Sequence, residues 1–159
     1  NHIGSAQRQS LAAVDAETGA PLPWNPTSSW NTQQWVSALA VQGNTLYLGG
    51  QTALYAEKRM GPGGIVEQFR QAFGNVLTTL AEVGGRPEDL VSITIYLTDV
   101  ADYQAHGREI GQVWRELAGT TYPAMAGIGT TALWQPEALI EILGVAVIPD
   151  ERLAPPAVG

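Results

Sequence analysis

The chain has 159 residues, of which 45% are hydrophobic and 14% are charged, and its formal net charge is −7. This length suits one domain with its own core, and the composition excludes a disordered chain. The acidic balance disfavours a nucleic-acid partner, because such binding depends on clustered Lys and Arg. No apolar run reaches about 18 residues, so we expect no membrane span.

The first 30 residues are predicted to form an N-terminal extension. The stretch "AETGAPLPWNPTSSWN" is rich in Pro, Gly, Ser, Thr and Asn, which favours an extended or looped segment. A regular pattern covers residues 31–150, and residues 151–159 form a Pro-rich tail that we expect to be poorly ordered. The first ten residues lack the apolar segment of a secretory signal, so we expect a cytoplasmic location.

A hairpin and a helix open the regular part of the chain. The runs "WVSALAV" and "TLYLGGQ" are strand-like, and "QGN" between them is a hairpin signal. Apolar residues then recur every three to four positions from Ile65 to Val83, which predicts an amphipathic helix. Gly84 and Gly85 end this helix, and Pro87 follows them.

Three further strands and a second helix follow in chain order. The run "LVSITIYLTD" alternates, with Val91, Ile93, Ile95 and Leu97 on one face. Asp99 or Asp102 is predicted to cap a helix whose apolar stripe runs from Tyr103 to Leu117 through Ile110 and either Val113 or Trp114. Residues 123–133 and 139–148 are predicted strands. The order β-β-α-β-α-β-β indicates an α+β sandwich.

The last strand is apolar on both of its faces. Ile140, Ile142 and Ile148 lie on one side, while Leu143, Val145 and Val147 share the other side with Glu141. Helices can cover only one face of the sheet. Another copy of the chain is the simplest cover for the second face, so we expect a homo-oligomer.

The segment from Trp35 to Pro149 resembles the Rid proteins, the YjgF-like reactive intermediate deaminases that also carry the label "endoribonuclease L-PSP". The matching pieces are "NTLYLGGQTAL", "FRQAFGNVLTTLAEVGGRPEDLVSITIYLTDVADY", "YPAMAGIG" and "ALIEILGVAVIP". The resemblance implies a chorismate-mutase-like sheet with two helices on one face. It also implies a homotrimer around a central barrel, with three clefts between subunits.

Upstream, "IGSAQRQSLAAVDAETGAPLPWNP" weakly resembles one unit of a bacterial propeller-type repeat. The chain contains no second copy of this unit, and a single blade cannot close a propeller. We therefore favour an extension that lies on the domain surface.

The Rid resemblance implies hydrolysis of a C=N bond without a metal or cofactor. In deaminating members, an arginine in a Pro-Ala-Arg-Ser motif binds the substrate carboxylate, and a glutamate in Ile-Glu-Ile positions the attacking water. Glu141 matches that glutamate and is the candidate catalytic residue. A carboxylate that is ion-paired or exposed at the rim is the alternative interpretation. The residues implied to contact substrate are Trp35, Gly50, Met125, Gly127 and Tyr103.

Several positions depart from the family pattern. Pro123 and Ala124 match the carboxylate-binding motif, but Met125 stands in place of its arginine and Ala126 in place of its serine. The apolar methionine side chain cannot hold a carboxylate; filling the core or an interface is its alternative role. Polar family residues are also replaced by glycine at positions 49 and 107, and Trp35 falls where the family has a cleft-lining tyrosine.

Metal chemistry is not expected from this sequence. It contains no cysteine, which excludes disulfides, thiolate metal sites and cysteine nucleophiles. His2 and His106 are its only histidines, and we find no partner for either at ligand spacing.

Three functions remain open from the sequence. The first is a Rid-type hydrolase for an imine or enamine that lacks a carboxylate or binds it differently, and so not for 2-aminoacrylate. The second is a non-catalytic trimer that binds a small molecule in the same clefts. The third, a ribonuclease, is disfavoured by the net charge and by the lack of a histidine pair.

Overall fold

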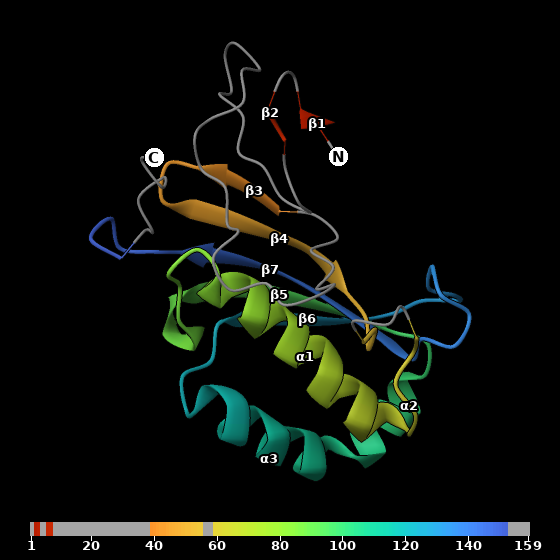
Figure 1. Cartoon of the computed structure of the whole chain (residues 1–159). Helices are drawn as coiled ribbons and strands as arrows, with labels where there is room; N and C mark the ends of the chain where they lie inside the picture. Colours follow the sequence, from red (N-terminus) through yellow and green to blue (C-terminus); the bar gives the residue numbers. More distant parts are fainter. Residues whose placement is uncertain (1, 4–5, 8–38, 56–58, 153–159) are drawn as a thin grey trace.

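The structure is a computed structural model that describes residues 2–3, 6–7, 39–55 and 59–152 (Figure 1). Most of the predicted N-terminal extension lies outside the described residues, and so does Trp35 of the predicted domain. Two short strands of the extension are described, β1 (His2–Ile3) and β2 (Ala6–Gln7), which pair with each other.

A five-stranded sheet forms the centre of the domain, in the order β3-β4-β7-β5-β6. Its strands are β3 (Leu39–Gln42), β4 (Thr45–Gln51), β5 (Leu90–Leu97), β6 (Ala124–Gly129) and β7 (Ile140–Val147). Neighbouring strands are antiparallel except β5 and β6, which are parallel. The predicted hairpin is β3–β4, whose turn holds Gly43 at a φ of 59°; a positive φ of this kind favours glycine.

The helices lie together on one side of the sheet (Figure 1). They are α1 (Ile65–Ala81), α2 (Val100–Ala105) and α3 (Gly107–Ala118), and a short 3₁₀ helix, η1 (Pro87–Asp89), leads into β5. The predicted α+β class is therefore confirmed. None of the described helices is both long and apolar enough to cross a membrane.

The periodicity of α1 is confirmed by its packing. Ile65, Phe69, Phe73, Val76 and Leu80 are all at most 3% exposed and form the centre of the core. The helix ends at Ala81, two residues before the predicted boundary, and the Gly85 N–H donates to the Leu80 carbonyl 3.0 Å away. This bond satisfies one of the free carbonyls at the helix end.

The second predicted helix is divided into two. Asp99 caps α2, because its carboxylate accepts a hydrogen bond from the Asp102 N–H at 2.9 Å. α2 ends at Ala105 and is followed by its C-cap His106, whose ring lies 2.9 Å from the Asp102 carbonyl; α3 begins at Gly107. Glycine is a poor helix former, which explains a break at this position.

The alternation of β5 differs from the prediction at its first residues. Val91 was expected to share a face with Ile93 and the other apolar residues of this strand, which are buried, but it is 45% exposed and Leu90 is buried instead. The register between β5 and β7 shifts between Leu90 and Ser92, so one residue is left out of the pairing. Such a bulge reverses the face of every residue before it.

Both faces of β7 are as predicted. Ile140, Ile142 and Ile148 are fully buried beneath the helices, and the alternate residues Leu143 and Val145 are partly buried on the second face. No described helix covers that second face, on which Val147 and Tyr47 are 39% and 46% exposed.

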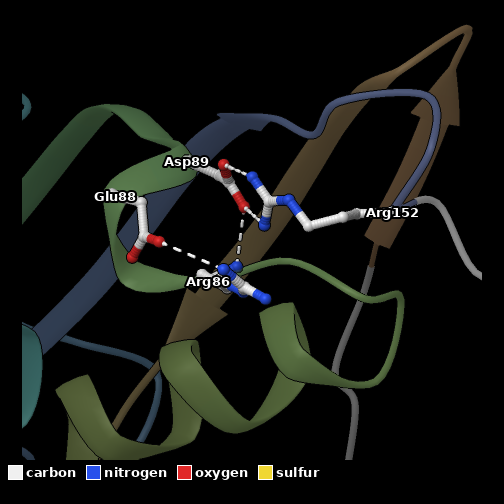
Figure 2. A network of polar contacts seen from close by, with 4 residues as sticks. All are labelled: Arg86, Glu88, Asp89 and Arg152. Atoms are coloured by element: carbon white, nitrogen blue, oxygen red, sulfur yellow. Dashed lines mark hydrogen bonds and ion pairs between the residues drawn. The ribbon is translucent and has the colours of Figure 1, made fainter.

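A network of polar contacts ties the last described residues to the start of β5 (Figure 2). The carboxylate of Asp89 is 6% exposed and accepts two hydrogen bonds from the Arg152 guanidinium, at 2.5 and 2.7 Å. It also accepts the backbone N–H of Arg86 at 2.7 Å. Arg152, which we assigned to the tail, therefore packs on the domain.

Candidate functional site on the second face of the sheet

The candidate acid/base residue, Glu141, lies near the start of β7. Its neighbours Ile140 and Ile142 are both 0% exposed and point into the core, so its carboxylate lies on the face away from the helices. The register pairs Glu141 with Tyr96 of β5, which shares that face. The Glu141 side chain is partly buried in the described structure.

Gly50 lies directly beneath the Glu141 carboxylate. A Cβ atom added to Gly50 would lie 1.8 Å from Glu141 Oε1, so only glycine leaves room for the carboxylate in this position. The register between β4 and β7 shifts between Leu48 and Gln51, which places Gly50 in the irregular part of β4. Gln51 supports this segment by donating a hydrogen bond to the Gly49 carbonyl at 3.2 Å. The structure thus brings two of the predicted site residues together.

Met125 and Gly127 lie on the other side of the sheet. They pair in register with Ile93 and Ile95 of β5, which are buried beneath the helices. Gly129 is the next residue of β6 on the same face as Met125 and Gly127. A Cβ added to Gly129 would meet Val100 of α2 at 3.0 Å, so this face of β6 is the helix side. β6 is an edge strand, and Met125 is 50% exposed there. Within one chain, Met125 and Glu141 therefore do not share a site.

Tyr103 and Trp35 are not placed beside Glu141 either. Tyr103 belongs to α2 and packs edge-on against Phe69 of α1, with 6.4 Å between the ring centroids. Burial raises the pKa of its phenol. Trp35 lies outside the described residues.

His106 is the histidine whose side chain the structure describes, and its hydrogen bond and ion pair lie within one helix turn. His106 lies 3.1 Å from the carboxylate of Asp102, a neighbour one turn earlier that our sequence reasoning overlooked. The Asp102 carbonyl and carboxylate together raise the pKa of His106. Among the described residues, no group of three His, Cys, Asp or Glu side chains could hold a metal ion.

Tyr96 is the site residue that sequence reasoning did not single out. It pairs with Glu141 on one side and with Ile128 of β6 on the other. The alternation of β5 had already placed Tyr96 on the face opposite Ile93 and Ile95. Only the strand order, with β7 inserted between β4 and β5, brings it beside Glu141.

The comparisons with known proteins agree with this fold. The model of the family described as endoribonuclease L-PSP matches residues 28–148. A 2-iminobutanoate/2-iminopropanoate deaminase of Dermatophagoides farinae is 30% identical over 131 residues, which cover 81% of this chain and 91% of the relative. A RutC family protein of Synechocystis is 32% identical over 132 residues, which cover 82% and 92%.

Two solved structures show the same fold. The YjgF gene product of E. coli superposes with a TM-score of 0.65 at 22% identity, over 75% of this chain and 94% of that one. A Mycobacterium tuberculosis member of the YjgF/YER057c/UK114 family superposes with a TM-score of 0.56 at 28% identity, over 69% and 84%. The chain belongs to the endoribonuclease L-PSP family, which is the Rid/YjgF family expected from the sequence.

Proposed function

We propose that the protein hydrolyses the C=N bond of a small imine or enamine, with Glu141 as the acid/base group. The observation that carries this proposal is the close packing of the Glu141 carboxylate against Gly50, on a sheet face that no described helix covers. Relatives named as imine deaminases support the reaction class. Carbon–nitrogen hydrolysis needs only water, a positioned acid/base group and a cleft that orients the imine.

In the proposed reaction, Glu141 accepts a proton from water while the water oxygen bonds to the imine carbon. The π electrons of the C=N bond pass to nitrogen, and Glu141 gives the proton it took from water to that nitrogen, which becomes the amine of a tetrahedral carbinolamine. Glu141 then takes the proton of the carbinolamine hydroxyl and passes it to the nitrogen as the C–N bond breaks. Ammonia or an amine leaves, and a carbonyl compound remains.

The proposed substrate carries no carboxylate. The deaminase relatives are named for 2-iminobutanoate and 2-iminopropanoate, which are imino acids. The family motif binds such a carboxylate with arginine, but this chain has the uncharged, half-exposed Met125 at that position. A substrate with an apolar or aromatic substituent suits methionine better. The same observation favours the second candidate function, a trimer that binds a small apolar molecule without turnover.

Replacing Glu141 by glutamine tests whether the site is catalytic. The parent should accelerate hydrolysis of the N–H imine of acetophenone, which has an aromatic ring and no carboxylate. Glu141→Gln should reduce that rate about a hundredfold or more, because an amide is similar in shape but cannot take up the proton. Imine absorbance in stopped flow measures both rates.

Glu109→Gln, on the exposed side of α3, is the matched control and should keep the parent rate. If the parent binds the imine but never exceeds the buffer rate, the site only binds. That outcome would replace the hydrolase proposal with the binding function.

Replacing Gly50 by alanine tests whether the contact between Gly50 and the Glu141 carboxylate matters for catalysis. The added methyl would displace Glu141 Oε1, and a misplacement of about 1 Å can cost on the order of a hundredfold in rate. The unfolding midpoint should change little, because the displaced atom is the end of a flexible side chain. Gly111→Ala is the control, since a Cβ there meets nothing within 4 Å. An unchanged rate for Gly50→Ala would show that this contact has no catalytic role.

We further propose that the chain works as a homotrimer. Met125 and Glu141 lie on opposite sides of one sheet, so a site that uses both positions needs two copies of the chain. Another copy would also cover the second face with Leu143 and Val145.

Light scattering tests the trimer, with an expected mass three times that of the chain. Val147→Asp should dissociate it, because burying an unpaired carboxylate is costly. Val100→Asp is the matched control, since both valines are 39% exposed and Val100 lies on the helix side. A parent that stays monomeric at micromolar concentration would exclude a site shared between subunits.

A further inference from the structure

A separate cavity lies between two loops at one end of the sheet. Its volume is about 410 Å³, within the roughly 300–1,000 Å³ range of small-molecule sites. One wall comes from the segment after β4 and the other from the segment before β7. The described lining residues are Leu54, Arg59, Met60, Gln135 and Glu137. None of them belongs to the Glu141 site.

Both walls are fixed to α1 by amide side chains. Asn75 donates two hydrogen bonds, each 2.9 Å long, to the carbonyls of Thr52 and Leu54. Gln68, which is 4% exposed, donates to the Glu137 carbonyl at 3.0 Å and accepts the Leu139 N–H at 2.8 Å. One helix thus sets the separation of the two loops, and the cavity is built into the fold.

The cavity carries two opposite charges that do not pair with each other. Arg59 and Glu137 both line it, yet none of the ion pairs among the described residues includes either side chain. A guanidinium favours a carboxylate, because it can donate two parallel hydrogen bonds. A carboxylate favours an ammonium group. A ligand with both groups would complement the cavity, with Leu54 and Met60 facing its apolar part.

We propose that this cavity binds a free α-amino acid with a medium-sized apolar side chain. Arg59 binds the carboxylate and Glu137 binds the ammonium group. The Gln135 amide adds a hydrogen bond, and Leu54 and Met60 contact the side chain of the ligand. This site is independent of the proposed hydrolase function and persists if that function fails.

Titration with L-leucine, followed by amide NMR, tests the site on the full chain. We expect millimolar L-leucine to shift the side-chain amide of Gln135 and the backbone amide of Leu139. Two analogues isolate the charges: 4-methylpentanoate lacks the ammonium group, and 3-methylbutylamine lacks the carboxylate. Each should bind about tenfold more weakly or worse, as expected from the loss of a charged hydrogen bond.

The variants assign each charge to its partner. Arg59→Gln should weaken the binding of L-leucine about tenfold and leave the binding of 3-methylbutylamine unchanged. Glu137→Gln should weaken the binding of L-leucine and leave the binding of 4-methylpentanoate unchanged. Arg108→Gln and Glu109→Gln, on the exposed side of α3, are charge-matched controls. The proposal is overturned if L-leucine shifts neither amide, or if both analogues shift them equally well. Binding that is lost in Glu141→Gln but kept in Arg59→Gln and Glu137→Gln also overturns it.

Discussion

Met125→Arg, combined with Ala126→Ser, is expected to raise imino-acid deamination by about ten- to a hundredfold in kcat/KM. Removing one partner of a buried charged pair costs on the order of 2–5 kcal/mol, because the other charge is left unpaired. The missing arginine alone therefore accounts for a large loss of imino-acid deamination. The gain should be partial, because glycine also replaces polar family residues at positions 49 and 107 and small misplacements reduce rates strongly. An imine generated by an amino-acid oxidase, followed by semicarbazide trapping, measures the rate.

Two further variants show how the gain arises. The same double change with Glu141→Gln should stay inactive, because no group then accepts the proton from water. Because positions 125 and 141 lie on opposite sides of one sheet, the gain should also vanish when Val147→Asp dissociates the proposed trimer. If the arginine variant assembles as a trimer yet only matches the parent, the hydrolase proposal loses its main support. Robust imino-acid deamination by the parent would show that another group replaces the arginine.

Asp89→Asn is expected to lower the free energy of unfolding by about 1.5–3 kcal/mol. The carboxylate of Asp89 is buried and holds both the Arg152 guanidinium and the Arg86 N–H, so its neutral replacement weakens hydrogen bonds to a charged group. Glu88→Gln is the control. Its carboxylate is exposed and lies 3.9 Å from the Arg86 guanidinium, so its loss should cost at most about 0.5 kcal/mol. Urea unfolding at one fixed protein concentration compares the two variants.

The same ion pair predicts a pH dependence. Burial alone would raise the pKa of Asp89, but the hydrogen bonds from Arg152 and Arg86 outweigh burial and lower the pKa below its ordinary value of 3.8. A lowered pKa means that the ionised form stabilises the fold above pH 3.8 and that this stabilisation is lost as the pH falls through the folded-state pKa. The difference in unfolding free energy between the parent and Asp89→Asn should therefore be constant near neutral pH and shrink below about pH 4. A difference that instead grows in acid would contradict this assignment.

Periodic segments were predictable from the sequence because the spacing of apolar residues indicates which face of a helix or strand is buried. The three- to four-residue spacing from Ile65 to Leu80 and the alternation of β7 both correspond to observed burial. Local irregularities were not predictable in this way. The exposure of Val91 depends on a bulge, and the contact of the His106 ring with the Asp102 carbonyl appears only in the folded helix turn.

The candidate site also has features that local sequence patterns predict and features that they do not. Glu141 was identified by its place in a motif, and alternation alone assigns its face. Its contact with Gly50 and its pairing with Tyr96 depend on strand order, which no local pattern encodes. The cavity beside Arg59 and Glu137 was missed because it is built from two loops without periodicity, joined only through α1.

The edge strand β6 has a consequence for how the protein reaches its working form. Its six residues are all exposed, and the chain carries no charged residue between Glu116 and Glu137. Charged residues normally keep such an edge from pairing with unrelated chains. A newly folded chain therefore presents an unguarded edge, and assembly into the proposed trimer competes with aggregation through it. Chain concentration and temperature during expression then decide the yield as much as the stability of the finished protein does.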